Sequence, residues 1–62
     1  MKRRELLKHL HLHGCKLLRE GGNHSWWFNP KMNKRSSVPR HKEIVDLLAI
    51  KICKDLGVPK VD

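Results

Sequence analysis

Hydrophobic residues in the first quarter of the chain recur at the spacing of a helix. Leu6, Leu7 and Leu10 lie within residues 3–13, and Gly14 follows them. Because glycine readily adopts the left-handed conformation in which many helices end, Gly14 marks the end of this segment. The pattern predicts a helix over residues 3–13, with one apolar side.

The middle of the chain loses this period and shows short segments of β character separated by turn residues. Residues 20–23 and residues 29–34 contain the glycine, asparagine and proline that favour turns. The spacing suits two hairpins in a three-stranded antiparallel arrangement. The expected strands are residues 15–20, 24–29 and 35–38. Pro39 has no backbone N–H to donate to a sheet, so we expect it to end the third strand.

The last third of the chain returns to helical spacing. A hydrophobic residue recurs every four positions from Ile44 to Leu56, and Gly57 and Pro59 follow. This stripe predicts a second helix that buries its apolar side and stops at Gly57.

The predicted order is α-β-β-β-α, which indicates an α+β fold. A three-stranded antiparallel sheet must hide one face, so we expect both helices on that face and the other face open. Double-stranded-RNA-binding domains have the same order, although the basic Lys-Lys-x-Ala-Lys cluster that usually opens their last helix is missing. Arg40, His41 and Lys42 stand in its place. Without internal repeats or a linker, residues 1–62 are expected to form a single domain.

Charge and length narrow the classes of function. The 62 residues include 14 Lys or Arg and 6 Asp or Glu, a formal charge of +8. Most large enzyme folds need a longer chain, whereas a basic surface is typical of proteins that bind phosphates or an acidic partner. No segment has the composition of a membrane span or an export signal, so we expect a cytoplasmic protein. Cys15 and Cys53 are then expected to be reduced thiols that pack in the core.

The main candidate for chemistry is the turn Gly21-Gly22-Asn23-His24. Its glycines allow a tight turn and close approach of a ligand, and His24 opens the second predicted strand. An imidazole titrates near neutral pH, so it can take a proton from a ribose 2′-hydroxyl or return one to a leaving 5′-oxygen. The competing interpretation is a turn histidine without a chemical role, and the pattern alone favours it.

The aromatic residues Trp26, Trp27 and Phe28 occupy consecutive strand positions. Strand side chains alternate between faces, so the three rings cannot share one side. If Trp27 points inward, then Trp26 and Phe28 share the open face with His24, where rings can stack on bases or anchor a partner. In the opposite orientation Trp26 and Phe28 lie in the core. Periodicity leaves both orientations open.

Basic residues near the turns and helix starts are candidates for RNA binding. Arg3 and Arg4 stand where the helix dipole opposes cations, an arrangement that a bound phosphate would reverse. A solvated basic terminus is the alternative. The further RNA-binding candidates are Arg19, Gly22, Asn23, Arg40 and Lys42.

The histidines before Gly14 invite a comparison with metal sites. His9 and His13 are one helical turn apart, but His11 points to the opposite side of the same predicted helix. These residues and Cys15 therefore do not make a closed set of four ligands. We expect no metal and no other cofactor. His41 is expected in the first turn of the second helix, with a second acid–base role as the alternative.

Several of these features together resemble the HicA toxins of bacterial and archaeal toxin–antitoxin systems. The resemblance rests on residues 2–7, Gly14-Cys15, Arg19, the turn at residues 22–24, residues 38–41 and residues 52–57. The family commonly has Gly-Ser-His where this chain has Gly-Asn-His, and an aromatic residue three positions after the histidine, which Trp27 matches. The resemblance implies an mRNA interferase with a fold like that of double-stranded-RNA-binding domains and with His24 as the catalytic residue.

The same resemblance implies a protein partner. HicA toxins are neutralised by a HicB antitoxin whose N-terminal domain covers the toxin, here expected over His24, Trp26 and Phe28. We accordingly expect an mRNA substrate and a free toxin that is monomeric but forms a hetero-oligomer with its antitoxin. The alternative is a non-catalytic module that binds double-stranded RNA by shape. His41, water or a substrate group remain candidates for the second proton transfer.

Overall fold

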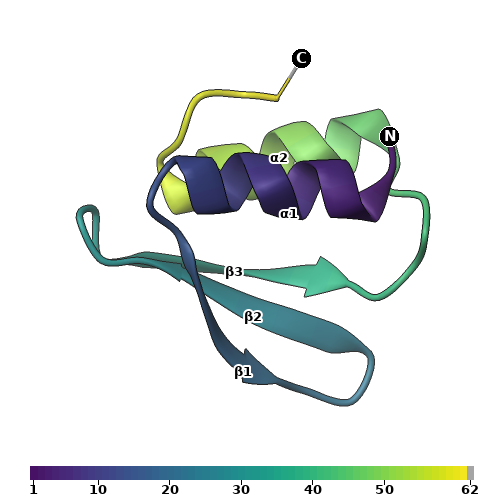
Figure 1. The fold of residues 1–62 in the computed structure, drawn as a ribbon, viewed down its shortest axis with the longest axis horizontal. Coiled ribbons are helices and arrows are strands. Elements are labelled where there is room, and N and C mark those ends of the chain that lie inside the picture. The colour runs from purple at the N-terminus through teal and green to yellow at the C-terminus, as the bar shows by residue number, and fades with distance from the viewer. Residues whose placement is uncertain (62) are drawn as a thin grey trace.

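The computed structural model describes residues 1–61. Its elements are α1 (Arg3–Leu12), β1 (Lys16–Glu20), β2 (His24–Asn29), β3 (Lys34–Pro39) and α2 (Asp46–Leu56). Both helices lie on one side of a single antiparallel sheet of order β1-β2-β3 (Figure 1). The predicted α+β fold, with its α-β-β-β-α order and its likeness to double-stranded-RNA-binding domains, is confirmed. The three strands and α1 each lie within one residue of their predicted bounds.

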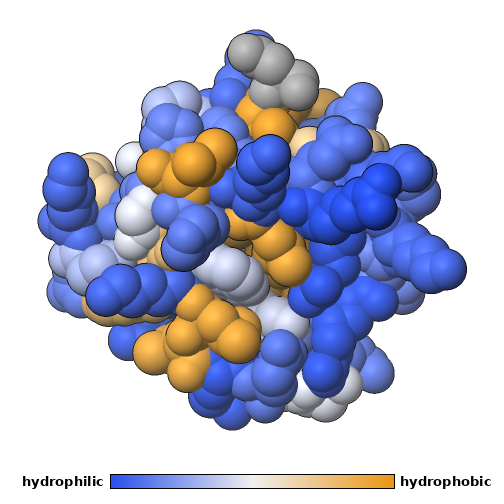
Figure 2. Space-filling model, viewed as in Figure 1, coloured by the Kyte–Doolittle hydropathy of each residue, from blue (hydrophilic) through white to orange (hydrophobic). Residues whose placement is uncertain are grey.

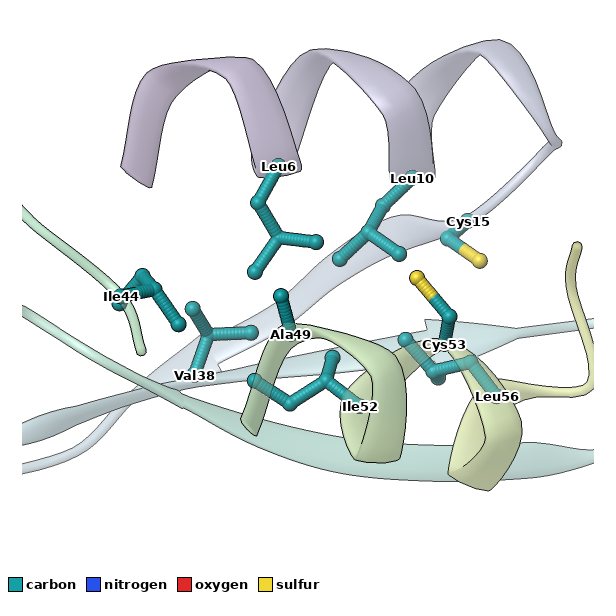
Figure 3. Packing of buried hydrophobic residues seen from close by; sticks show 9 residues of the cluster. All are labelled: Leu6, Leu10, Cys15, Val38, Ile44, Ala49, Ile52, Cys53 and Leu56. Atoms are coloured by element: carbon teal, nitrogen blue, oxygen red, sulfur yellow. The ribbon is translucent and has the colours of Figure 1, made fainter. Parts of the chain in front are cut away.

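The core lies between the two helices and the inner face of the sheet (Figure 3). Each buried aliphatic side chain contributes about 1.5–3 kcal/mol through removal of its surface from water. The buried hydrophobic residues are Leu6, Leu10, Cys15, Val38, Ile44, Ala49, Ile52, Cys53 and Leu56. They include most positions of the two predicted amphipathic stripes, while Leu7 and Leu48 are partly buried and pack against the core.

The start of α2 differs from the prediction. Ile44 is buried, but it lies in an extended segment before the helix, where its backbone exchanges hydrogen bonds with Met1. Val45 is the N-cap residue, and its side chain is 70% exposed. The four-residue spacing therefore ran past the true helix start, because an extended residue can fill the same core as the helix that follows it.

The orientation of β2 resolves the alternative that periodicity left open. Ser25 and Asn29 are buried, and Trp27 packs against the core. Because strand side chains alternate, Trp26 and Phe28 project from the opposite face together with His24. The arrangement with Trp26 and Phe28 in the core is thus wrong.

The two cysteines are packing residues, as expected. Cys15 and Cys53 are buried free thiols, and both side chains lie at the same end of the core, between the helices (Figure 3). Burial raises the pKa of both thiols, because a thiolate loses hydration there. Both residues therefore hold their protons more strongly than exposed cysteines do. No helix in residues 1–61 has the length and apolar character needed to cross a membrane.

Candidate functional site

His24 is exposed at the rim of the sheet, where β2 begins. The Gly21 N–H donates to the His24 carbonyl oxygen at 2.8 Å, which closes the preceding turn. A Cβ at position 21 would lie 3.2 Å from that oxygen, so a larger residue would press on the turn. His24 also lies opposite Pro39 of β3 in the strand register. The His24 imidazole is therefore exposed to solvent. Its backbone is fixed by the turn and by the pairing of β2 with β3.

The Arg40 side chain stabilises this turn. Its guanidinium donates to the carbonyl oxygens of Gly21 and Gly22 and forms an ion pair with Glu20 at 3.3 Å. Its backbone N–H donates to the Asn23 carbonyl oxygen at 3.3 Å. Arg40, a candidate for RNA binding, thus uses its guanidinium to hold the turn that precedes His24. Arg40 therefore acts as a brace of the site.

A second brace is centred on Ser25, which lies on the inner face of the sheet and is 1% exposed. The Ser25 hydroxyl donates to a Glu20 carboxylate oxygen at 2.5 Å and accepts a hydrogen bond from the Arg3 guanidinium at 2.9 Å. Arg3 also donates through Nε to the Pro39 carbonyl oxygen at 2.9 Å. These contacts connect the start of α1 to both strands beside His24.

Ser25 and Glu20 were not among the residues singled out from the sequence. A polar residue at an inward strand position was the available signal, because buried hydroxyls normally have hydrogen-bond partners. The identity of those partners could not be read from the sequence, since Arg3 lies 22 positions from Ser25.

A cationic cleft lies next to the braced turn. It encloses about 610 Å³ and is lined by Lys2, Arg3, Arg4, Arg40, His41, Lys42 and Glu43. The Arg3 N–H donates to the Lys42 carbonyl oxygen at 2.8 Å, which joins the start of α1 to the segment before α2. Hydrophilic residues predominate on the right-hand side of the view, where the start of α1 and the connection from β3 to α2 lie (Figures 1 and 2). Five cationic side chains and one carboxylate give the cleft a positive potential suited to phosphate groups.

The RNA-binding candidates do not all lie in this cleft. Arg3, Arg4, Arg40 and Lys42 line it, whereas Gly22 and Asn23 are exposed in the turn. Arg19 lies on the open face of the sheet, with its guanidinium carbon 5.9 Å from the centre of the Trp26 ring. Four of the candidates thus line the cleft, two lie in the turn before His24, and Arg19 lies on the sheet.

His41 does not belong to the first turn of α2, as the sequence suggested. It lies in the segment that joins β3 to α2, because the helix begins only at Asp46. There His41 lines the cationic cleft. A second imidazole thus lies on the side of the molecule that carries the cations.

His9 of α1 and His13, the C-cap residue of that helix, lie in structural contacts. The His9 and His13 rings lie 4.5 Å apart, and the His9 Nε2 forms a hydrogen bond of 2.7 Å with the Pro59 carbonyl oxygen. This contact holds the segment after α2 against α1. Within residues 1–61, no group of three or more His, Cys, Asp or Glu side chains is arranged to hold a metal ion.

The fold and the site define a small basic α+β domain in which an exposed histidine lies between a cationic cleft and an open sheet face. Residues 3–58 match the family model described as the HicA toxin of bacterial toxin–antitoxin systems. The chain belongs to the HicA toxin family, and this membership confirms the resemblance seen in its motifs. Comparisons with curated proteins and with solved structures give no significant match.

Proposed function

We propose that this toxin is an mRNA interferase, a metal-independent endoribonuclease that inhibits translation, with His24 as its acid–base group. The observation that carries the proposal is the exposed His24 ring on a braced turn beside a cleft lined by five cations. Acid–base chemistry on RNA needs both parts, because a positioned imidazole moves the proton and the cations hold the charged polymer.

The reaction follows from the chemistry of RNA itself. The ribose 2′-oxygen attacks the adjacent phosphorus while His24 accepts the proton of the 2′-hydroxyl. The bond between phosphorus and the 5′-oxygen then breaks, and the departing oxygen takes up a proton. The products are a 2′,3′-cyclic phosphate and a 5′-hydroxyl, so neither an external nucleophile nor a redox step is needed.

The cleft contributes phosphate binding in this proposal. Lys2, Arg4 and Lys42 are exposed there, and within residues 1–61 their side chains make no hydrogen bond or ion pair. They are therefore available to non-bridging phosphate oxygens. Arg3 and Arg40 contribute mainly by bracing the turn, as their hydrogen bonds indicate. His41 lines the same cleft and is a candidate for the second proton transfer, alongside water and a substrate group.

A HicB antitoxin is the proposed partner that neutralises this activity. Membership of a toxin family supports an antitoxin in general. His24, Trp26 and Phe28 share a sheet face that neither helix covers, so one partner domain could bury all three. Buried aromatic residues are common anchors of protein interfaces. Growth arrest on expression, relieved by coexpression of the antitoxin, would support this pairing, and continued arrest would contradict it.

The test of the activity uses purified protein and single-stranded RNA in the presence of EDTA. Wild-type protein should cleave, and His24→Ala should cleave about 10²- to 10⁴-fold more slowly, the usual contribution of acid–base catalysis. His11→Ala is the matched control, because His11 is exposed on α1 and outside both the cleft and the sheet.

Retained cleavage by His24→Ala, or cleavage of a substrate with deoxyribose at the scissile position, would contradict the proposal. The fold also resembles modules that only bind double-stranded RNA, which is the second candidate function. Tight duplex binding by wild-type protein without new RNA ends would favour that alternative.

A further inference from the structure

The sheet face opposite the helices carries a second surface with a distinct composition. We call it the open face. The strand register places Lys16 and Arg35 on either side of Phe28, and Arg19 and Ser37 on either side of Trp26. Residues directly opposite one another in an antiparallel sheet point to the same side. The open face therefore consists of Lys16, Arg19, His24, Trp26, Phe28, Arg35, Ser37 and Pro39.

The charge of this face is entirely positive. Lys16, Arg19 and Arg35 are exposed cations, and none of the open-face residues is acidic. The neighbouring carboxylate of Glu20 turns to the inner side, where it accepts the Ser25 hydrogen bond. A ligand of this surface should consequently carry negative charge along with flat groups that can cover two aromatic rings.

The rings stand in a row on the central strand. His24, Trp26 and Phe28 occupy alternate positions of β2, so neighbouring members are about 6.5–7 Å apart along the strand. Arg19 beside the Trp26 ring adds a cation next to a stacking surface. RNA-binding sheets commonly stack two or three unpaired bases on aromatic residues of this kind.

We propose that the open face binds unpaired RNA, with bases stacked on Trp26 and Phe28 and with phosphates held by Lys16, Arg19 and Arg35. An RNA bound in this way passes along the row of rings toward His24. The RNA that this face binds is therefore single-stranded. A duplex fits this surface poorly, because its bases already stack on one another and hide their faces. The link to cleavage rests on the proposed function, whereas binding itself does not.

Binding by an antitoxin at the same rings is compatible with this assignment, since an inhibitor that covers the open face would compete with the substrate. The charge nevertheless favours RNA as the ligand for which the face is built. Three cations flank the two rings there, a combination that suits a ligand with both phosphate groups and flat bases.

The experiment measures binding separately from cleavage. The probe is a fluorescently labelled 2′-O-methyl oligonucleotide, which lacks the 2′-hydroxyl nucleophile and so stays intact. The same strand annealed to its complement and an abasic strand of equal charge serve as comparison ligands. Wild-type protein should bind the single strand more tightly than either, because only the single strand offers free base faces.

The variants are Trp26→Leu and Phe28→Leu, which remove a ring from a face outside the core. Each should weaken single-strand binding by about 5- to 150-fold while leaving abasic-strand binding unchanged. Trp26→Phe retains a ring and should recover most of the loss. Leu47→Ala is the matched control, because Leu47 is an apolar side chain on α2 that is 78% exposed. Circular dichroism verifies that each variant is folded.

Equal binding of the single strand, duplex and abasic strand would overturn the proposal, as would ring variants that bind like wild type. Ring variants that lose only binding to an antitoxin would assign the face to a protein partner and also overturn it. If wild-type protein fails to cleave RNA but the ring dependence holds, the open face stands and the nuclease assignment falls. If wild-type protein cleaves RNA but binding does not depend on the rings, the nuclease assignment stands and the open-face proposal falls.

Discussion

Removal of the Ser25 hydroxyl tests whether the brace beneath His24 stabilises the protein. Ser25→Ala deletes a hydrogen bond to Glu20 at 2.5 Å and one from Arg3 at 2.9 Å. Hydrogen bonds to charged groups contribute about 1.5–3 kcal/mol each when buried. The Glu20 side chain is 51% exposed and regains water after the substitution. We therefore expect each hydrogen bond to contribute about 1 kcal/mol to the free energy of unfolding.

The expected loss for Ser25→Ala is therefore about 2 kcal/mol in the free energy of unfolding. In a domain of this size, that loss lowers Tm by about 8–16 °C. Urea unfolding followed by circular dichroism measures the free energy, and a thermal scan measures Tm. Ser37→Ala is the control, because Ser37 is on the open face and forms no side-chain hydrogen bond within residues 1–61. It should change stability by less than about 0.5 kcal/mol.

A double-mutant cycle distinguishes the brace from a general packing effect. Ser25→Ala and Arg3→Gln should show a coupling energy of about 0.5 kcal/mol or more, since the two residues share a hydrogen bond. Additive effects, or a Ser25→Ala loss no larger than that of Ser37→Ala, would refute the reasoning.

Three further predictions concern the interior and the cleft. Asn29→Ala removes a buried amide that donates to the last carbonyl of α2 at 2.7 Å, so urea unfolding should show a loss of about 1–3 kcal/mol; an unchanged midpoint would contradict this. Burial raises the pKa of Cys15 and Cys53, and the unfolded chain therefore releases these protons at lower pH than the folded chain. The free energy of unfolding should be undiminished below the unfolded value of 9.0 and fall as pH rises above it, a trend that Cys15→Ala/Cys53→Ala should reduce. Lys42→Gln should lower the slope of log affinity against log salt for RNA by about 1, and an unchanged slope would exclude a phosphate contact.

The sequence by itself determined the order of the elements and the position of the candidate histidine. Helical and strand periods are local properties, and so are the glycines that end helices. Gly14 and Gly57 both have positive φ angles, of 85° and 71°, as expected for residues that end helices. His24 begins β2 as the turn chemistry predicted.

The sequence also identified the family, because the motifs occur in order along nearly the whole chain. It did not predict the start of α2, since Ile44 and the helix contribute to the same core from different backbone conformations. Because α2 begins later than predicted, His41 lies in the cleft and not in the helix. A periodic pattern records which residues are buried, and a short extended segment can satisfy it as well as a helix.

Only the tertiary structure decided which side of β2 is buried and which cations remain free. Consecutive aromatic residues show no alternation of polar and apolar positions, so the packing of Trp27 against the core made the choice. Arg3 and Arg40 look like Arg4 in sequence, yet within residues 1–61 only the first two form side-chain hydrogen bonds, with acceptors distant in sequence. Contacts between residues distant in sequence depend on how the helices dock on the sheet. Local pattern supplied the histidine, and long-range packing determined its surroundings.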